Sequence, residues 1–267
     1  SHPELLDLLA ADFVASGWDL RRLLHQMVMS ETYRQQSEAT PELLEKDPYN
    51  RLLARAPRFR LAAEFVRDGA LAASGLLNDD LGGPSVHPYQ PDGLWEEVSH
   101  YGYPKPFSSQ KFLPGSGRVL YRRSLYTTWK RTSPPPSMAI FDAPSRETCS
   151  VRRLNTNTPL QALVLQNDPQ FLEAAHALGD LMAAEGSPQD GIDLGAKRVL
   201  GRAPTTKEQG VLSAALVRYR QAYQSQAEKA RQLLASAGAP GSSDPVQVAW
   251  TLVASTLLNM DEAVTRQ

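Results

Sequence analysis

Apolar residues recur at helical spacing in the first part of the chain. Leu5, Leu9 and Phe13 fall on one face of a helix, because side chains three or four residues apart lie above one another on a helical surface. A second apolar stripe follows over residues 20–28, and a third begins near residue 61. The pattern predicts helices throughout residues 1–78, with the third helix running to about residue 78.

Helix-start signals return after residue 157. Residues 158–161 read Thr-Pro-Leu-Gln, which supplies an N-cap, a proline at the first helical position and the glutamine of a capping box. Residues 205–208 (Thr-Thr-Lys-Glu) form a second capping box, and Asp-Pro pairs stand at 168–169 and 244–245. The segment 246–258 is apolar on almost all sides, which predicts a centrally buried helix.

Glycine and proline interrupt every long helical pattern between residues 79 and 157. From residue 79 to 136 these breakers leave residues 95–100 as the longest helix expected. Residues 118–129 are rich in Val, Tyr, Leu, Thr and Trp, a composition that favours one or two short strands. We therefore expect a mainly α fold with a loop-rich insertion. The expected organisation is one large helical domain over 1–267, divided into helical 1–78, loop-rich 79–157 with a basic cluster, and helical 158–267.

The amino-acid composition limits the classes of protein to which the chain can belong. Apolar residues make up 42% of the 267 residues, and the formal net charge is −1, so the chain is an ordinary globular protein without a global charge that would favour nucleic acid. No apolar run is long enough to span a membrane. The single cysteine, Cys149, excludes an internal disulfide. Since no Cys-x-x-Cys-His motif is present, no c-type haem is expected on this chain.

The chain start carries a separate expectation. The first residues, Ser-His-Pro-Glu, read as a helix start, and there is no initiator methionine or signal sequence before them. We expect that a preceding segment has been removed and that any targeting signal lies in it.

The densest polar cluster lies between residues 118 and 168. Arginine dominates its basic residues, and its planar guanidinium suits bidentate binding of carboxylate, sulfate or phosphate. Aromatic side chains are interleaved with the arginines. The same arginines can instead be structural, pairing with internal carboxylates and loop carbonyls. The candidate ligand-binding residues are Arg122, Arg123, Trp129, Arg131, Arg146, Arg152 and Trp95.

Candidate catalytic residues are few. The sequence has no phosphate-binding loop, no nucleophile elbow and no histidine pair at metal-ligand spacing, so no metal site is expected. Asp142, Glu147 and Asp168 are candidate acids, and His87 and His100 are candidate bases. Sequence alone pairs none of them in space.

Several segments form one continuous pattern. They are residues 122–126 (Arg-Arg-Ser-Leu-Tyr), 129–132 (Trp-Lys-Arg-Thr), 134–138 (Pro-Pro-Pro-Ser-Met), 141–147 (Phe-Asp-Ala-Pro-Ser-Arg-Glu), 155–163 (Asn-Thr-Asn-Thr-Pro-Leu-Gln-Ala-Leu) and 167–169 (Asn-Asp-Pro). Residues 1–7, 30–35, 47–53 and 250–262 belong to the same pattern. It resembles the planctomycete-specific domain of unknown function 1553.

The resemblance implies a cellular context more than a reaction. Members of that family sit at the C-terminal end of large exported proteins, periplasmic or at the cell surface, often behind cytochrome-c-like domains. A c-type haem is then expected only on an upstream domain of the same polypeptide, and that upstream part is the expected partner. The resemblance carries no catalytic residues over to this chain.

Two functions are compatible with these observations. The chain is either an accessory module that binds or processes an acidic or sulfated polysaccharide, or a scaffold or docking module for an attached cytochrome-c-like redox domain, without catalysis. The arginine and aromatic cluster and the long loop zone favour the first. The capping chemistry of residues 155–168 is explained by the second without any ligand.

Overall fold

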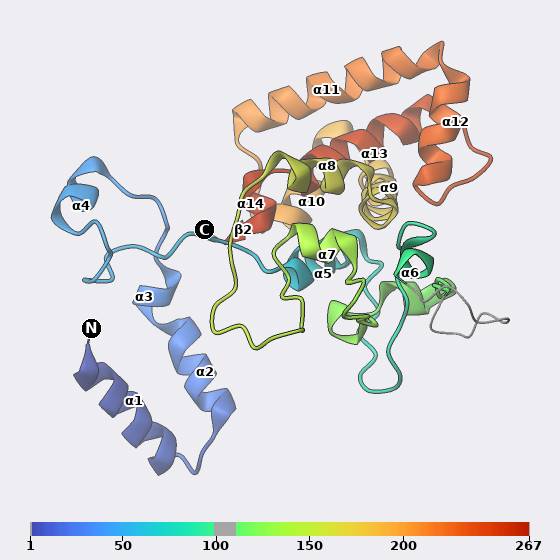
Figure 1. The fold of residues 1–267 in the computed structure, drawn as a ribbon. Coiled ribbons are helices and arrows are strands. Elements are labelled where there is room, and N and C mark those ends of the chain that lie inside the picture. Colours follow the sequence, from blue (N-terminus) through green and yellow to red (C-terminus); the bar gives the residue numbers. More distant parts are fainter. Residues whose placement is uncertain (1, 99–110, 267) are drawn as a thin grey trace, which may run out of the picture. The chain divides into compact units, whose positions relative to one another are not determined.

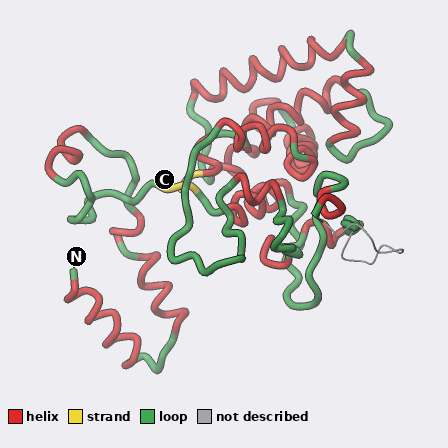
Figure 2. Tube along the Cα trace, in the orientation of Figure 1, coloured by secondary structure: helices red, strands yellow, loops and turns green. Residues whose placement is uncertain are grey.

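The computed structural model describes residues 2–98 and 111–266. The chain divides into two compact units. The N-terminal unit comprises Ser1–Phe59 with Thr265–Gln267, and the helical unit comprises Arg60–Val264. Helices dominate both units (Figure 2), and the sheet among the described residues pairs only β1 (Phe59–Arg60) with β2 (Thr265–Arg266). The expected mainly α fold is confirmed, whereas the expectation of one large domain stays a prediction.

The N-terminal unit begins with a helical hairpin (Figure 1). Its helices are α1 (Pro3–Ala15), α2 (Leu20–Met29), α3 (Glu31–Arg34) and α4 (Pro41–Lys46). Gly17 turns the chain after α1 with a φ of +72°, and the Asp19 carboxylate caps α2 by accepting the Arg22 amide at 3.1 Å. All residues of these four helices are described, and none is buried.

The core of the helical unit is built around one central helix. Its helices are α5 (Ala63–Ser74), α8 (Pro159–Asn167), α9 (Pro169–Ala183), α10 (Pro188–Leu200), α11 (Thr206–Gln224), α12 (Ala227–Ser236), α13 (Pro245–Leu258) and α14 (Asp261–Val264). Helix α13 packs against α9 and α11, and Val248, Val253 and Leu257 are fully buried. The apolar run at 246–258 is thus a central helix, as its pattern predicts.

The loop-rich segment differs from the expectation in one respect. It contains α6 (Leu94–Glu97) and α7 (Pro136–Ile140). In place of strands, residues 118–129 form two 3₁₀ helices, Gly117–Tyr121 and Ser124–Tyr126. Pairing in this segment is limited to isolated bridges, Asn78 with Arg122 and Val86 with Thr127, while side chains from α5 bond to other backbone groups of the segment. The Asp68 carboxylate accepts the Ser124 amide at 2.8 Å, and Arg67 donates to the carbonyls of Leu120 and Arg122.

Two predictions about helix ends also need correction. Helix α5 ends at Ser74 rather than near residue 78, because Gly75 adopts a φ of +80° and its amide caps the helix end. The capping box at 158–161 does not form, since the Thr158 side chain caps no amide. Gln161 is buried instead and donates to the Ile140 carbonyl at 3.0 Å. The capping box at Thr205 and the caps at Asp168 and Asp244 are confirmed.

Within the described part of the chain, no helix combines the length and apolar character that crossing a membrane requires.

Candidate functional site

Arg122 is a structural residue rather than an exposed anion ligand. Its side chain is buried, and its guanidinium donates to the carbonyls of Pro84 at 2.9 Å, Asp80 at 3.0 Å and Gly82. The same group lies 3.8 Å above the Tyr126 ring. Arg122 therefore holds the turn at residues 80–84 in place.

A second buried arginine, Arg67, was not identified as a candidate from the sequence. Arg67 on α5 donates to the carbonyls of Leu120 at 2.6 Å and Arg122 at 2.8 Å, and to Gln170 Oε1 at 2.5 Å. Burial lowers the pKa of the Arg67 guanidinium, and the negative charges of Asp68 and Asp168 oppose this. Within the amphipathic pattern of residues 61–74, Arg67 directly follows Val66 on the apolar side. A charged residue at that position was the available signal.

Trp129 and Arg146 are two predicted residues that the structure brings together. The Arg146 guanidinium lies 4.4 Å above the Trp129 ring, and Trp129 Nε1 donates to the Ser145 carbonyl at 3.0 Å. Nearby, Arg153 donates to both Glu64 oxygens, at 2.7 and 3.2 Å. Arg153 and Arg146 both act to lower the pKa of Glu64. This cluster is already paired internally.

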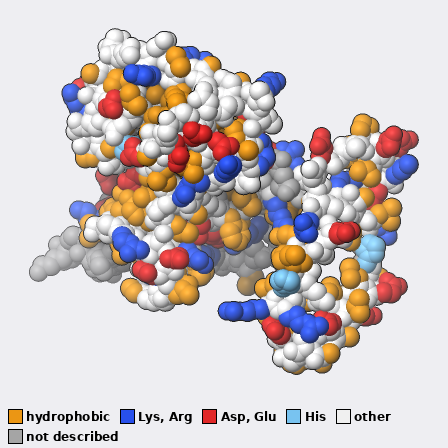
Figure 3. All heavy atoms as spheres, turned by 180° about the vertical axis from the view of Figure 1, so that it is seen from behind, with side chains coloured by type: hydrophobic (Ala, Val, Ile, Leu, Met, Phe, Trp, Pro, Cys, Tyr) orange, Lys and Arg blue, Asp and Glu red, His pale blue; other side chains and the backbone are white. Residues whose placement is uncertain are grey.

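The remaining predicted arginines, Arg123, Arg131 and Arg152, are exposed. Basic and acidic side chains are interspersed on the face of the molecule that Figure 3 draws, and no single basic patch dominates it.

Trp95 and His87 belong to a small aromatic cluster. Trp95 is buried, and its ring lies 6.0 Å from His87 and 5.2 Å from Phe112, both edge to face. Lys130 Nζ lies 4.7 Å from the Trp95 ring. These contacts pack the loop-rich segment against itself. The other candidate base, His100, lies outside the described residues.

The predicted acids have separate structural contacts. Asp142 accepts hydrogen bonds from the Thr156 amide at 2.6 Å and the Thr156 hydroxyl at 2.8 Å. Asp168 caps α9 by accepting the Gln170 amide at 2.9 Å. Burial raises the pKa of Asp168, with the Glu173 charge adding to the effect. Glu147 is exposed.

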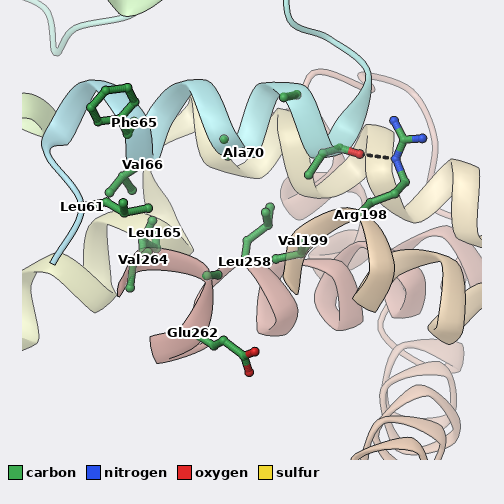
Figure 4. A pocket seen from close by; sticks show the side chains of 14 residues that line it. Leu61, Phe65, Val66, Ala70, Leu165, Arg198, Val199, Leu258, Glu262 and Val264 are labelled. Carbon is green, nitrogen blue, oxygen red and sulfur yellow. Dashed lines mark hydrogen bonds between the residues drawn. The ribbon is translucent and has the colours of Figure 1, made fainter. Parts of the chain in front are cut away.

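Figure 4 shows an apolar groove on one side of α5. It has a volume of about 530 Å³, and side chains such as Leu61, Val66 and Leu258 line it. The charged residues at its edge already bond within the chain: Arg198 Nε donates to the Ala73 carbonyl at 2.5 Å, and Glu262 accepts from Arg202. We therefore do not assign a binding role to this groove.

A polar groove of about 530 Å³ lies where five helices meet. We call it the polar groove. Leu172, Leu233 and Leu252 provide apolar surface, and Tyr219 also lines the groove. The other lining residues carry amides, hydroxyls or an amine: Gln166, Asn167, Lys229, Gln232, Ser236, Ser255 and Thr256.

The sequence interpretation did not find the polar groove because its residues are spread over α8, α9, α11, α12 and α13. The available signal was in residues 229–236, where Lys229, Gln232, Leu233 and Ser236 share one helical face. Such a face, polar with one leucine, is typical of a partly covered surface.

A second cleft of about 520 Å³ lies between residues 89–91, α7 and α8 and also has Asn167 in its lining. We call it the proline cleft, because Pro91, Pro136 and Pro169 line it. Tyr89 forms part of its wall and donates to Glu173 Oε1 at 2.8 Å. Burial raises the pKa values of Glu173 and Tyr89.

Fold and grooves together define a mainly helical domain whose surface offers a polar groove at a helix junction. No cluster of three or more potential metal ligands occurs among the residues that the structure describes. Residues 1–216 match the family described as PSD1, protein of unknown function (DUF1553), and the chain belongs to this family. Neither the curated proteins nor the solved structures contain a match to this chain.

Proposed function

We propose that this chain is a non-catalytic accessory module of a larger exported protein and that it binds an acidic polysaccharide in the polar groove. The observation that carries the proposal is the composition of the groove lining. Saccharide rings are amphipathic, with apolar C–H faces and a periphery of hydroxyls. Leucines beside a tyrosine, surrounded by amides and hydroxyls, match that chemistry.

The charge of the groove favours an anionic ligand. Lys229 is the one charged residue among the described residues that line the groove. Its compact ammonium suits a uronate carboxylate or a sulfate. Because the Lys229 side chain is exposed, the ion pair is screened by salt, and its contribution to affinity is about fivefold at most.

The same lining favours binding over cleavage. Glycoside hydrolysis generally needs two carboxyl groups on opposite sides of the scissile bond. No aspartate or glutamate stands among the described groove residues. The predicted acids Asp142 and Asp168 cap backbone groups elsewhere in the fold, so polysaccharide processing is the weaker half of the sequence hypothesis.

Titration calorimetry tests the proposal. Oligosaccharides that carry uronate or sulfate are compared with neutral oligosaccharides of equal length. For Lys229→Ala we expect affinity for the acidic set to fall about fivefold, with affinity for the neutral set unchanged. Lys207→Ala is the matched control, because Lys207 is an exposed helical lysine outside the groove. Equal effects of the two variants, or no binding of any acidic glycan, would reject the proposal.

A scaffold or docking role for an attached cytochrome-c-like domain is the second candidate. The contacts of Arg67 and Arg122 favour it, since the buried arginines bond to loop carbonyls rather than to open space. The double variant Arg122→Ala plus Arg146→Ala distinguishes arginines that hold the fold together from arginines that bind an anionic ligand. Loss of the fold in that variant supports a scaffold role for these arginines, whereas an intact fold with weakened acidic-glycan binding supports an anion site at the predicted cluster.

A further inference from the structure

We propose that the binding track continues from the polar groove into the proline cleft, and that the ligand is a polymer in which anionic units alternate with uncharged, acetamido-bearing units. This inference rests on the proposed function, since it extends the same site. It names the class of polysaccharide that fits both recesses at once.

The two recesses meet at one residue. Asn167 is the last residue of α8 and lines both the polar groove and the proline cleft. Its side chain is exposed, and Nδ2 donates to the Leu163 carbonyl at 2.8 Å. In the proposed track, a ligand passes from Lys229 to the cleft by way of the Asn167 amide.

The proline cleft is chemically different from the polar groove. Its walls are mainly apolar and include Pro91, Pro136, Ile140, Leu160 and Leu163. They suit a methyl group rather than a charged substituent. Asp168 also lines the cleft, and its carboxylate would repel a second anion. The unit bound here is therefore uncharged.

Gln90 specifies the polar part of that unit. It lines the proline cleft, and its Oε1 atom is buried with no hydrogen-bond partner in the described structure. A buried acceptor without a donor is unfavourable. In the proposed complex the Gln90 side chain turns its Oε1 atom toward the cleft, where the N–H of an acetamido group supplies the donor and the methyl group of that unit fits the apolar wall.

The cleft is held open without a ligand. Tyr89 is tied to α9 by its hydrogen bond to Glu173, whose other oxygen accepts from Tyr121 at 3.2 Å. Gln170 Nε2 also donates to the Tyr89 carbonyl at 3.4 Å. Because two hydrogen bonds anchor Tyr89, and Tyr121 in turn holds Glu173, little ordering of this wall is required when the ligand binds.

Hyaluronan oligosaccharides test the inference, because glucuronate and N-acetylglucosamine alternate in them. Affinity for the full chain is expected to rise about tenfold from disaccharide to hexasaccharide, as the second recess becomes occupied. Oligogalacturonates of the same lengths carry only anionic units and are expected to show no such rise.

Leu163→Trp is the variant that fills the cleft. Leu163 is 52% exposed on α8, so a larger side chain fits without disturbing the core. We expect it to abolish the rise with length and to leave disaccharide affinity intact. Val217→Trp is the control, since Val217 is 55% exposed and lies outside both recesses.

The outcomes separate the two proposals. If Lys229-dependent disaccharide binding persists but affinity does not rise with length, or rises equally for oligogalacturonate, the extended track is overturned and the proposed function stands. If no acidic oligosaccharide binds, both are overturned.

Discussion

Arginine side chains in this protein show how one residue type can serve two purposes. The guanidinium fork that suits a sulfate or carboxylate also suits two or three backbone carbonyls. Arg67 and Arg122 are used in the second way. The sequence could identify an unusual density of arginine, but the carbonyls that Arg67 and Arg122 bond to are 38 to 55 residues away, so no local pattern could assign them.

Removing the buried guanidinium of Arg67 should be strongly destabilising. Arg67→Met leaves the buried carbonyls of Leu120 and Arg122 without their donor, at about 1–3 kcal/mol for each unsatisfied group. We expect urea denaturation to show a loss of at least about 2 kcal/mol in the free energy of unfolding. Arg131→Met is the control and should change it by less than about 0.5 kcal/mol, because Arg131 is exposed. Equal midpoints for the two variants would contradict the structural role of Arg67.

The Asp168 carboxyl makes stability depend on pH in an unusual direction. Burial raises its pKa above the ordinary aspartate value of 3.8. Between that value and the raised one, the native state binds more protons than the unfolded state, so stability falls as pH rises through this window. The raised pKa of Glu173 acts in the same direction above its ordinary value of 4.5.

Asp168→Asn should remove the aspartate part of this pH dependence. Asparagine caps a helix about as well as aspartate, so α9 keeps its cap while the buried charge is lost. The free energy of unfolding, measured from about pH 4 to 7, is expected to decline less steeply in the variant than in the wild type. Parallel curves would show that the Asp168 charge carries no such penalty.

At the scale of elements, two glycines in similar helical positions differ in their surroundings. A Cβ added at Gly179 on α9 would lie 2.9 Å from the Trp250 carbonyl carbon on α13. A Cβ added at Gly210 on α11 would meet nothing within 4 Å. Gly179 therefore permits the close approach of α9 to the central helix, and Gly210 has no such role.

This difference predicts opposite effects of the same substitution. Gly179→Ala is expected to lower the free energy of unfolding by about 1–3 kcal/mol through overpacking. Gly210→Ala is expected to raise it by about 0.5–1 kcal/mol, because alanine favours the helix and restricts the unfolded chain. Thermal and urea unfolding measure both. A stabilising Gly179→Ala would mean that α9 and α13 are not packed this closely.

The sequence predicted helices and helix caps well where all the residues that define them lie within a few positions of one another. Asp168, Thr205 and Asp244 cap their helices as expected, and the apolar run of α13 is central. The strands expected at 118–129 are reduced to isolated bridges at Arg122 and Thr127, and Asp68 and Arg67 bond to other backbone groups of that segment. Gln161 does not form the expected capping box for a similar reason, because its side chain donates to the Ile140 carbonyl, which is distant in sequence.

At the scale of the whole molecule, the family match and the proposed site overlap only in part. The match covers residues 1–216, which includes Gln166, Asn167 and Leu172 of the polar groove. Tyr219, Lys229 and the remaining groove residues follow it. The family match therefore does not cover the whole groove lining, and acidic-glycan binding is proposed for this chain rather than for the family.

A crystal structure of the full chain with a bound hyaluronan hexasaccharide is the most direct test of the central claim. The account predicts a glucuronate carboxylate at hydrogen-bond distance from Lys229 Nζ, a sugar ring against Tyr219, and the chain passing Asn167. A saccharide bound instead at the exposed Arg123, Arg131 and Arg152 would contradict it and restore the arginine cluster as the binding site.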